Sequence, residues 1–244
     1  DAAPCHPNAS LLPAALAIAG SRREVGGREL ITAVAVGCDL VWAPLKTEMY
    51  PEGFATKVIP AGAAEGLETD FRPHFFGGVA TVCTKLFTQT GADFAMFGEK
   101  DFQQLSIVRK MVKDLCMTIR VVGVSTKRDE DGLAKSSRNG YLSLDQRRIA
   151  PVLHETLVCC RDAIACGFDN FLQLESHARM KLLQAGFDPD YFAIRDARTL
   201  RTVTPDTEEI AILAAARLGA TRLIDNVRLS LNPAADWGML ASGH

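Results

Sequence analysis

Two helical segments alternate with two short apolar segments in the middle of the chain, and this alternation constrains the fold more than any other feature. Apolar residues recur at helical spacing over residues 79–87 and again over residues 105–115. A short, mostly apolar segment follows each helix, over residues 93–97 and 119–124. Strands of this kind that alternate with helices indicate a parallel sheet covered on both faces. The sequence therefore predicts an α/β fold built on a Rossmann-like parallel sheet.

The residues before this region carry weaker signals. The first 23 residues are rich in Ala and Pro and show no periodic pattern. A helix is predicted over residues 29–37, where Gly37 would end it, and a short buried strand over residues 39–43. Residues 44–78 contain many prolines and glycines and little periodicity, which predicts a long loop or a hairpin region.

The pattern changes after residue 124. Residues 125–143 are charged, contain two glycines and have no apolar period, so we place a domain hinge at or near them. The elements predicted beyond the hinge are helices over 144–165 and 170–185, a strand over 191–195, a helix over 208–218 ended by Gly219, and a strand over 222–229. The sequence therefore predicts two domains, a Rossmann-like domain over residues 1–124 and a smaller α+β domain over residues 125–244.

Composition excludes several classes of function. The formal net charge of the 244 residues is −2, which argues against nucleic-acid binding and against a polybasic membrane anchor. No apolar run approaches the ~18 residues that span a bilayer. Seven cysteines without C-x-x-C spacing are expected to be reduced thiols of a cytoplasmic protein. Five scattered histidines suggest no His-based metal site.

Polar residues cluster where the strand over residues 93–97 ends and the next helix begins. Ligands bind at the carboxyl ends of strands in open parallel sheets, and Gly98 would let a ligand approach the backbone. A helix N-terminus with Lys100 beside it suits a phosphate, and Asp101 could accept hydrogen bonds from ribose hydroxyls. In the alternative interpretation Asp101 is an ordinary N-cap, Lys100 is solvated, and Gln103 and Gln104 lie on the surface.

A second polar cluster follows in the predicted hinge. Lys135, Ser136, Ser137 and Arg138 precede Asn139 and a glycine. Hydroxyl donors, a guanidinium fork and an ammonium group together can surround a polyphosphate. The alternative is a polar turn before a helix that Ser143 caps.

Three further segments are weaker candidates. Residues 72–78, which begin Arg-Pro-His and end Gly-Gly, could form a lid over a site or simply a tight connection into a helix. Arg195 with Asp196, and Asp225 with Asn226, are expected to be structural or to face a dimer partner.

Taken together, six segments resemble the pantoate–β-alanine ligases, a family of the nucleotidyltransferase superfamily related to class I aminoacyl-tRNA synthetases. The most diagnostic are F-G-E-K-D-F-Q-Q-L at residues 97–105 and D-G-L-A-x-S-S-R-N-x-Y-L-S at residues 131–143. The others, in the family's order, are A-P-x-x-x-E-M-Y-P-x-G-F-A-T at 43–56, F-R-P-x-F-F-x-G-V-A-T-V at 71–82, R-D-A-x-T-L at 195–200 and A-A-R-L-G-x-T-R-L-I-D-N at 215–226.

The resemblance implies a two-step reaction and a set of partners. Pantoate would attack the α-phosphate of Mg²⁺-bound ATP to give pantoyl adenylate and pyrophosphate, and β-alanine would then displace AMP to give pantothenate. Catalysis would come from alignment and charge stabilisation. The resemblance also implies the cofactors ATP and Mg²⁺, with no metal ligand assigned among the side chains, and a cytoplasmic homodimer.

The resemblance also assigns roles to individual residues. Lys100 would contact the nucleotide phosphates, Gly98 and Asp101 would face the ribose, and Gln104 would hold pantoate. The remaining ATP-binding residues would be Lys127 and the phosphate-clamping loop of Ser136, Ser137 and Arg138. Lys100 and the three residues of that loop would form the catalytic set.

The sequence departs from the family near its start. The family's Met-Gly-x-Leu-His-x-Gly-His and N-P-x-Q-F segments, which bind ATP phosphates and pantoate, have no counterpart here, and His74 stands one place earlier than the family's histidine. Losing several such contacts at ~2–4 kcal/mol each predicts little turnover. The alternatives are an inactive member that serves as a nucleotide-binding or dimerisation module, and an adenylate-forming enzyme that uses a different acid.

Overall fold

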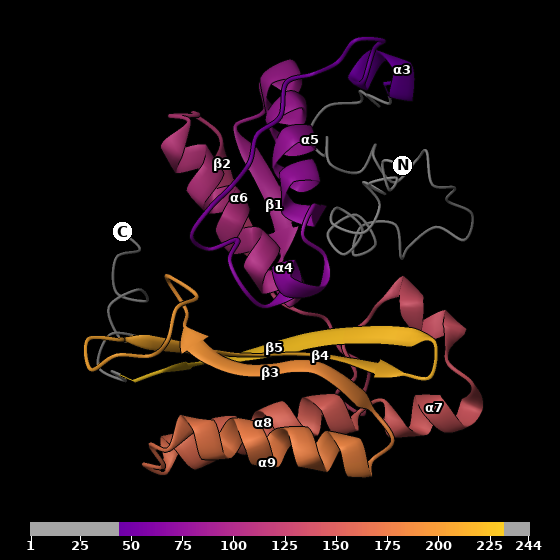
Figure 1. Ribbon diagram of the computed structural model, residues 1–244, viewed down its shortest axis with the longest axis vertical. Coiled ribbons are helices and arrows are strands. Elements are labelled where there is room, and N and C mark those ends of the chain that lie inside the picture. Colours follow the sequence, from indigo (N-terminus) through magenta and orange to yellow (C-terminus); the bar gives the residue numbers. More distant parts are fainter. Residues whose placement is uncertain (1–43, 232–244) are drawn as a thin grey trace, which may run out of the picture. The chain divides into compact units, whose positions relative to one another are not determined.

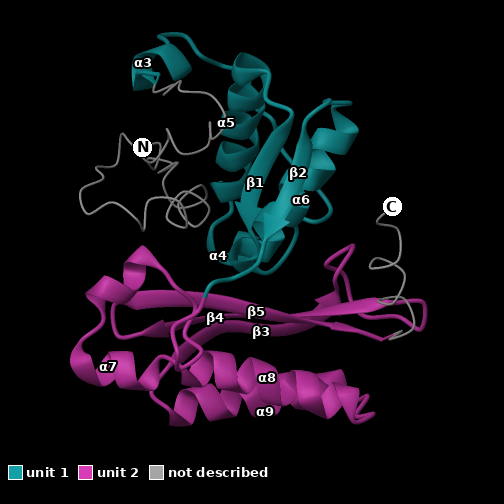
Figure 2. Ribbon diagram, turned by 180° about the vertical axis from the view of Figure 1, so that it is seen from behind, with its two compact units in different colours: residues 1–127 teal, residues 128–244 magenta. Residues whose placement is uncertain are grey.

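The computed structural model describes residues 44–231, and the helix predicted over 29–37 and the strand predicted over 39–43 lie outside that part. The chain divides into two compact units, residues 1–127 (unit 1) and residues 128–244 (unit 2), which Figure 2 shows in teal and magenta. Each unit has its own buried apolar cluster, so each is described by itself.

Unit 1 contains the alternating strands and helices that the periodicity predicted. Its elements are α3 (Lys46–Met49), α4 (Glu68–Phe71), α5 (Phe75–Thr90), β1 (Phe94–Gly98), the 3-10 helix η2 (Glu99–Asp101), α6 (Phe102–Asp114) and β2 (Arg120–Val124). Strands β1 and β2 pair in parallel, with Phe94 opposite Arg120 and Gly98 opposite Val124. Residues 44–74 contain only the two short helices α3 and α4.

The core of unit 1 lies on one face of this sheet. Ala95 and Phe97 of β1 are buried with apolar residues of α5 and α6, and the ring of Phe87 lies 6.3 Å from that of Phe97. Phe94 and Met96, which alternate with them, are 54% and 44% exposed. Successive strand residues point to opposite faces, so within the described residues one face is well covered, whereas cover on both faces was predicted.

The segment considered as a lid is the start of a helix. Helix α5 begins at Phe75, so Gly77 and Gly78 lie inside its first turn rather than in a loop. The Arg72 guanidinium lies 3.7 Å from the centre of the Phe75 ring and contacts the first residue of the helix. These residues therefore form a tight connection into α5.

Unit 2 is a three-stranded antiparallel sheet with two long helices on one face (Figure 1). Its elements are the 3-10 helix η3 (Ser137–Tyr141), α7 (Leu144–Ile149), α8 (Val152–Ala165), α9 (Phe171–Gln184), β3 (Asp188–Asp196), β4 (Glu209–Leu218) and β5 (Thr221–Ser230). The strand order is β3-β4-β5, so β4 is central. Residues of α8 and α9 share a core with alternate residues of the strands.

Two predicted elements of this unit are wrong. The helix predicted over residues 144–165 is broken between Ile149 and Val152, because Pro151 has no N–H to continue the helical hydrogen bonds and instead stands at the N-cap of α8. Ser143 nevertheless caps α7 as predicted, through its side chain and the backbone N–H of Gln146.

The helix predicted over residues 208–218 is the central strand β4. Its Ala-rich sequence has high helix propensity, but both edges of the segment are paired, Ile212 with Ile194 of β3 and with Val227 of β5. Ladder hydrogen bonds on both sides and burial along the strand outweigh local propensity. Gly219 is consequently not a helix cap; with φ of +60° it starts the two-residue connection from β4 to β5.

Candidate functional site

The first polar cluster lies at the end of β1, as predicted. Gly98 is the last residue of the strand, Lys100 and Asp101 belong to η2, and α6 begins at Phe102. Gly98 is buried, whereas Lys100 and Asp101 are partly exposed. Asp101 occupies the N-cap position of α6, but its side chain makes no capping hydrogen bond. The alternative in which Asp101 is an ordinary N-cap therefore lacks the side-chain bond that such a cap makes.

Gln103 is a structural residue. Its side-chain amide donates to the carbonyls of Ala63 and Gly66, both at 3.1 Å, and its oxygen accepts from the N–H of Glu68 at 3.0 Å. The side chain is 3% exposed, so these bonds are sheltered from water. Gln103 thereby ties the irregular segment before α4 to the start of α6.

Gln104 has the same burial as Gln103 but different hydrogen bonding. It is also 3% exposed, so the alternative of two surface glutamines is wrong. Its Oε1 is buried and has no hydrogen-bond partner among the described residues. A buried acceptor without a partner costs about 1–3 kcal/mol, and a ligand that donates a hydrogen bond to it would remove that cost.

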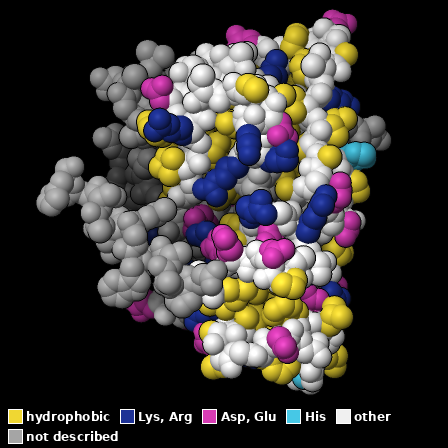
Figure 3. All heavy atoms as spheres, turned by 90° about the vertical axis from the view of Figure 1, so that its left-hand side faces the viewer, with side chains coloured by type: hydrophobic (Ala, Val, Ile, Leu, Met, Phe, Trp, Pro, Cys, Tyr) yellow, Lys and Arg dark blue, Asp and Glu magenta, His cyan; other side chains and the backbone are white. Residues whose placement is uncertain are grey.

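The end of β2 adjoins the same turn. A Cβ added at Gly123 would lie 2.9 Å from Oε1 of Glu99 and 3.1 Å from Nη2 of Arg109, so only glycine fits without displacing them. Helix α6 also carries exposed Arg109, Lys110 and Lys113. Figure 3 shows Lys and Arg side chains gathered on the face of unit 1 that α6 and β2 present. A local basic face thus exists despite the net charge of −2.

The second polar cluster follows an ordered turn in unit 2. Arg128 and Ala134 form a backbone bridge that closes residues 128–134, and the N–H of Asp129 donates to the carbonyl of Leu133 at 2.9 Å. Leu133 is buried in the core of the unit. Ser136 then caps η3 by accepting from the N–H of Arg138 at 3.3 Å. The predicted phosphate-clamping residues therefore begin at Ser136, two positions after Ala134, whose backbone is held by the bridge to Arg128.

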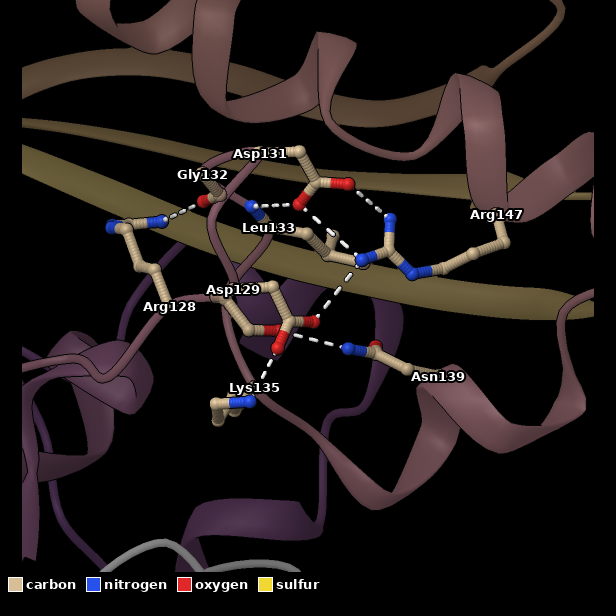
Figure 4. Close-up of polar contacts among 9 residues, drawn as sticks. Arg128, Asp129, Asp131, Gly132, Leu133, Lys135, Asn139 and Arg147 are labelled. Carbon is tan, nitrogen blue, oxygen red and sulfur yellow. Dashed lines mark hydrogen bonds and ion pairs between the residues drawn. The ribbon is translucent and has the colours of Figure 1, made fainter.

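Ion pairs surround this turn and line a pocket of about 580 Å³ (Figure 4). Lys135 pairs with Asp129, and Arg147 of α7 pairs with both Asp129 and Asp131. The hydrogen bond from Arg147 is the main reason that the pKa of Asp131 lies below its usual value. These acidic residues and Arg147 were not predicted as site residues, because their pairing joins positions up to 18 residues apart across a turn.

The remaining predicted site residues are accessible. Lys127, the last residue of unit 1, and Ser137 are exposed, and Ser136 and Arg138 are partly exposed. The described structure therefore brings Gly98, Lys100, Asp101 and Gln104 together in unit 1, and Ser136, Ser137 and Arg138 together in unit 2. The predicted convergence of the two groups on one nucleotide stays a prediction.

Comparison with known proteins decides between the predicted activities. A model of the family described as pantoate-beta-alanine ligase matches residues 28–228 of the chain. The chain belongs to the pantoate–β-alanine ligase family. A pantothenate synthetase of Bradyrhizobium sp. is 49% identical over 210 residues, covering 85% of this chain and 74% of the relative. A pantothenate synthetase of Ectopseudomonas mendocina is 47% identical over 200 residues, covering 81% of this chain and 70% of the relative.

Solved structures of pantoate–β-alanine ligases resemble the chain as well. The pantothenate synthetase of Thermus thermophilus aligns with a TM-score of 0.73 at 42% identity, covering 78% of this chain and 70% of that one. A ligase of Francisella tularensis, solved in complex with β-alanine and an ATP ligand, aligns with a TM-score of 0.57 at 27% identity over 74% of this chain. The predicted resemblance and the predicted nucleotidyltransferase-like α/β fold are thereby confirmed.

Family membership also bears on the alternatives. The activity of pantoate–β-alanine ligases, ATP-dependent formation of pantothenate, is the predicted function, and the comparisons favour it over a nucleotide-binding or dimerisation module. Within residues 44–231 no helix is long and apolar enough to cross a membrane. The same residues contain no group of three or more His, Cys, Asp or Glu side chains that could hold a metal ion.

Gly132, in the turn before Ser136, gives a test of the local geometry. Its φ is +87°, and an added Cβ would lie 2.8 Å from Cδ2 of His154. We expect Gly132→Ala to lower the free energy of unfolding by about 1–3 kcal/mol. Thermal or urea unfolding would measure the loss. Gly140→Ala is the control, because no atom of residues 44–231 lies within 4 Å of its added Cβ. Equal losses in both variants would contradict the prediction.

Proposed function

We propose that this chain joins pantoate to β-alanine in two steps and that Gln104 and Lys100 hold the two substrates of the first step. The observation that carries the proposal is the buried Oε1 of Gln104, which has no hydrogen-bond partner among the described residues and lies in the first turn of α6, four residues after Lys100 of η2. In the first step the pantoate carboxylate attacks the α-phosphorus of ATP and pyrophosphate leaves. In the second the amine of β-alanine attacks the acyl carbon and AMP leaves.

The residues after β1 would bind the nucleotide. Gly98 leaves the backbone open to a ligand at the carboxyl end of the strand. Lys100 would neutralise the phosphates, where negative charge develops as pyrophosphate departs. Asp101 would accept hydrogen bonds from ribose hydroxyls. This role is supported by its place directly after β1 and before α6, and by the resemblance to the family.

Pantoate would lie against the start of α6. Its hydroxyl groups are donors, and Oε1 of Gln104 is an acceptor that lacks a donor among the described residues. One such hydrogen bond would orient the carboxylate toward the α-phosphorus, and orientation is the main source of rate in reactions of this kind.

The loop of Ser136, Ser137 and Arg138, with Lys127, would clamp the phosphates from the other unit. Hydroxyls donate to phosphate oxygens, and guanidinium binds two of them at once. On this proposal residues 1–124 bind nucleotide and pantoate, and residues 125–244 act as the lid domain. Both groups would have to reach one triphosphate for the chemistry to proceed.

The proposal also covers the Mg²⁺ ion and the oligomeric state of the chain. The described residues contain no cluster of acidic or His side chains fit to hold a metal. The ion would therefore enter on the phosphate oxygens of ATP, where it would neutralise charge on the leaving pyrophosphate. We further propose a cytoplasmic homodimer, on the resemblance to the family; sedimentation of the purified chain tests the dimer.

Exchange of labelled pyrophosphate into ATP tests the first step. Exchange should require pantoate and should proceed without β-alanine, because adenylate formation reverses before the amine is needed. Exchange that is independent of pantoate, or that another hydroxy acid supports equally well, would contradict the assignment and favour an enzyme that activates a different acid.

Arg138→Ala tests the clamp. We expect KM for ATP to rise about 10- to 100-fold, because a charge-assisted fork to phosphate is lost. Arg148→Ala is the control, since Arg148 is an exposed arginine of the same unit whose side chain pairs with Asp145 one turn away. Initial rates at varied ATP concentration provide the measurement, and an unchanged KM in Arg138→Ala would remove the loop from the ATP site.

A further inference from the structure

A buried ion pair connects the turn before the clamp loop to the sheet of unit 2. Arg128 donates from Nη1 and Nη2 to the two carboxylate oxygens of Asp225, at 2.6 and 3.0 Å. The two residues are 97 positions apart in the chain, Arg128 at the start of the turn and Asp225 in β5. A two-bonded guanidinium–carboxylate pair fixes orientation as well as distance.

The same arginine also holds the backbone on either side of the pair. Its Nη1 donates to the carbonyl of Gly132 at 3.1 Å, and its Nη2 donates to the carbonyl of Asn226 at 3.3 Å. Figure 4 shows Arg128 directed toward Gly132 at the far end of the turn. One side chain thus bonds the turn internally and bonds it to β5.

Asp225 is the point where three elements meet. Its side chain is 3% exposed, and Nδ1 of His154, in α8, lies 3.2 Å from its Oδ2. Burial alone would raise the pKa of this carboxyl, but the contacts with His154 and Arg128 outweigh burial and lower the pKa below its usual value. Asp225 is therefore a carboxylate at neutral pH, bound by Arg128 of the turn and lying beside His154 of α8.

The turn passes this constraint on to the clamp residues. Ala134 closes the turn by its bridge to Arg128, and its carbonyl accepts from Nδ2 of Asn139 at 3.1 Å. Ser136, Ser137 and Arg138 lie between those two contacts. A loop held at both ends in this way can adopt few conformations. This matters because small displacements of phosphate-binding groups have large effects on binding and rate.

We propose that Asp225, acting through Arg128, is a positioning residue that sets where Ser136, Ser137 and Arg138 meet the phosphates of ATP. This inference rests on the proposed role of that loop. Replacing a buried ion pair by apolar residues is often neutral for stability, so a buried pair is by itself weak evidence of a role in stability. Its placement at the base of the clamp gives it a function.

The test compares Asp225→Asn with a matched control in the same strand system. Asp190 of β3 pairs with Arg222 of β5 at 2.5 Å, and the two side chains are nearly buried, at 11% and 12% exposure. This pair joins β3 to β5, whereas the Asp225 pair joins the turn to β5. We expect Asp225→Asn to raise KM for ATP about 10- to 100-fold while KM for pantoate stays within about twofold. Asp190→Asn should lower thermal stability and leave KM for ATP within about twofold.

Several outcomes decide the inference. An unchanged KM for ATP in Asp225→Asn, or equal changes in both variants, would show that Asp225 has only a structural role. If Asp225→Asn does not fold, Arg128→Lys replaces it, because lysine keeps the charge but not the two-bonded fork; a normal KM for ATP in that variant would also overturn the inference.

Arg138→Ala, measured in parallel, separates this inference from the proposed function. A normal KM for ATP in Arg138→Ala removes the loop from the site, and the inference falls with it. A raised KM in Arg138→Ala together with a normal one in Asp225→Asn refutes the positioning role alone. If both are raised, the double variant should be weaker than Arg138→Ala by much less than the full effect of Asp225→Asn, because residues that act through one another are not additive. Full additivity would contradict the inference.

Discussion

Replacing Lys100 by alanine is expected to lower kcat/KM for ATP by about 10²- to 10³-fold. Lys100 lies in η2, directly after the carboxyl end of β1, where the proposed site binds the phosphates. Losing one preorganised charge of this kind costs about 2.7–4 kcal/mol of transition-state stabilisation. Steady-state rates of AMP release at varied ATP concentration measure the loss.

Lys113→Ala is the control for this prediction. Lys113 lies in the last turn of α6 and is exposed, so it shares the basic face of unit 1 without standing at the strand end. Its removal should change kcat/KM by no more than about twofold. Equal losses of kcat/KM in the two variants would mean that the overall positive charge of this face, and not Lys100 in particular, promotes the use of ATP.

Replacing Gln104 by leucine is expected to lower kcat/KM for pantoate about 10- to 100-fold without loss of stability. The side chain is buried and Oε1 lacks a partner among the described residues, so leucine removes an unpaired acceptor from the fold and a proposed contact from the substrate. Thermal unfolding and initial rates at varied pantoate concentration are the two measurements.

Replacing the adjacent Gln103 by leucine is expected to lower stability instead. Gln103→Leu leaves the carbonyls of Ala63 and Gly66 and the N–H of Glu68 without their partner, which should cost about 2–4 kcal/mol of unfolding free energy. The expected pattern is therefore stability lost at Gln103 and pantoate use lost at Gln104. The reverse pattern, or stability lost equally at both, would show that Gln104 is structural.

This pair of glutamines shows where prediction from the sequence ends. Two identical residues in adjacent positions, both 3% exposed, differ in their contacts: the side chain of Gln103 bonds three backbone groups, whereas Oε1 of Gln104 has no hydrogen-bond partner among the described residues. Their type and position were enough to place a polar cluster at the start of α6. Which of them had a partner depended on a segment some 35 to 40 residues away in sequence.

The helices and strands also differ in how far the sequence predicts them. Helices α5 and α6 and strands β1 and β2 were predicted because their apolar periods are regular and their contacts are local to one unit. Strand β4 was predicted as a helix because its alanines favour one, and only pairing with β3 and β5 makes it a strand. The sequence pattern was sufficient for elements whose apolar period is regular, and insufficient for a strand that forms only through pairing with its neighbouring strands.

The ion pairs around the turn of unit 2 differ in how dissolved salt acts on them. Lys135 and Arg147 are 52% and 34% exposed, so their pairs with acidic residues are hydrated and are screened within about 8 Å at physiological ionic strength. The Arg128–Asp225 pair, with the carboxylate 3% exposed, lies largely beyond the reach of mobile ions. Concentrated electrolyte should therefore loosen the solvent-facing edge of the turn and leave its attachment to the sheet intact.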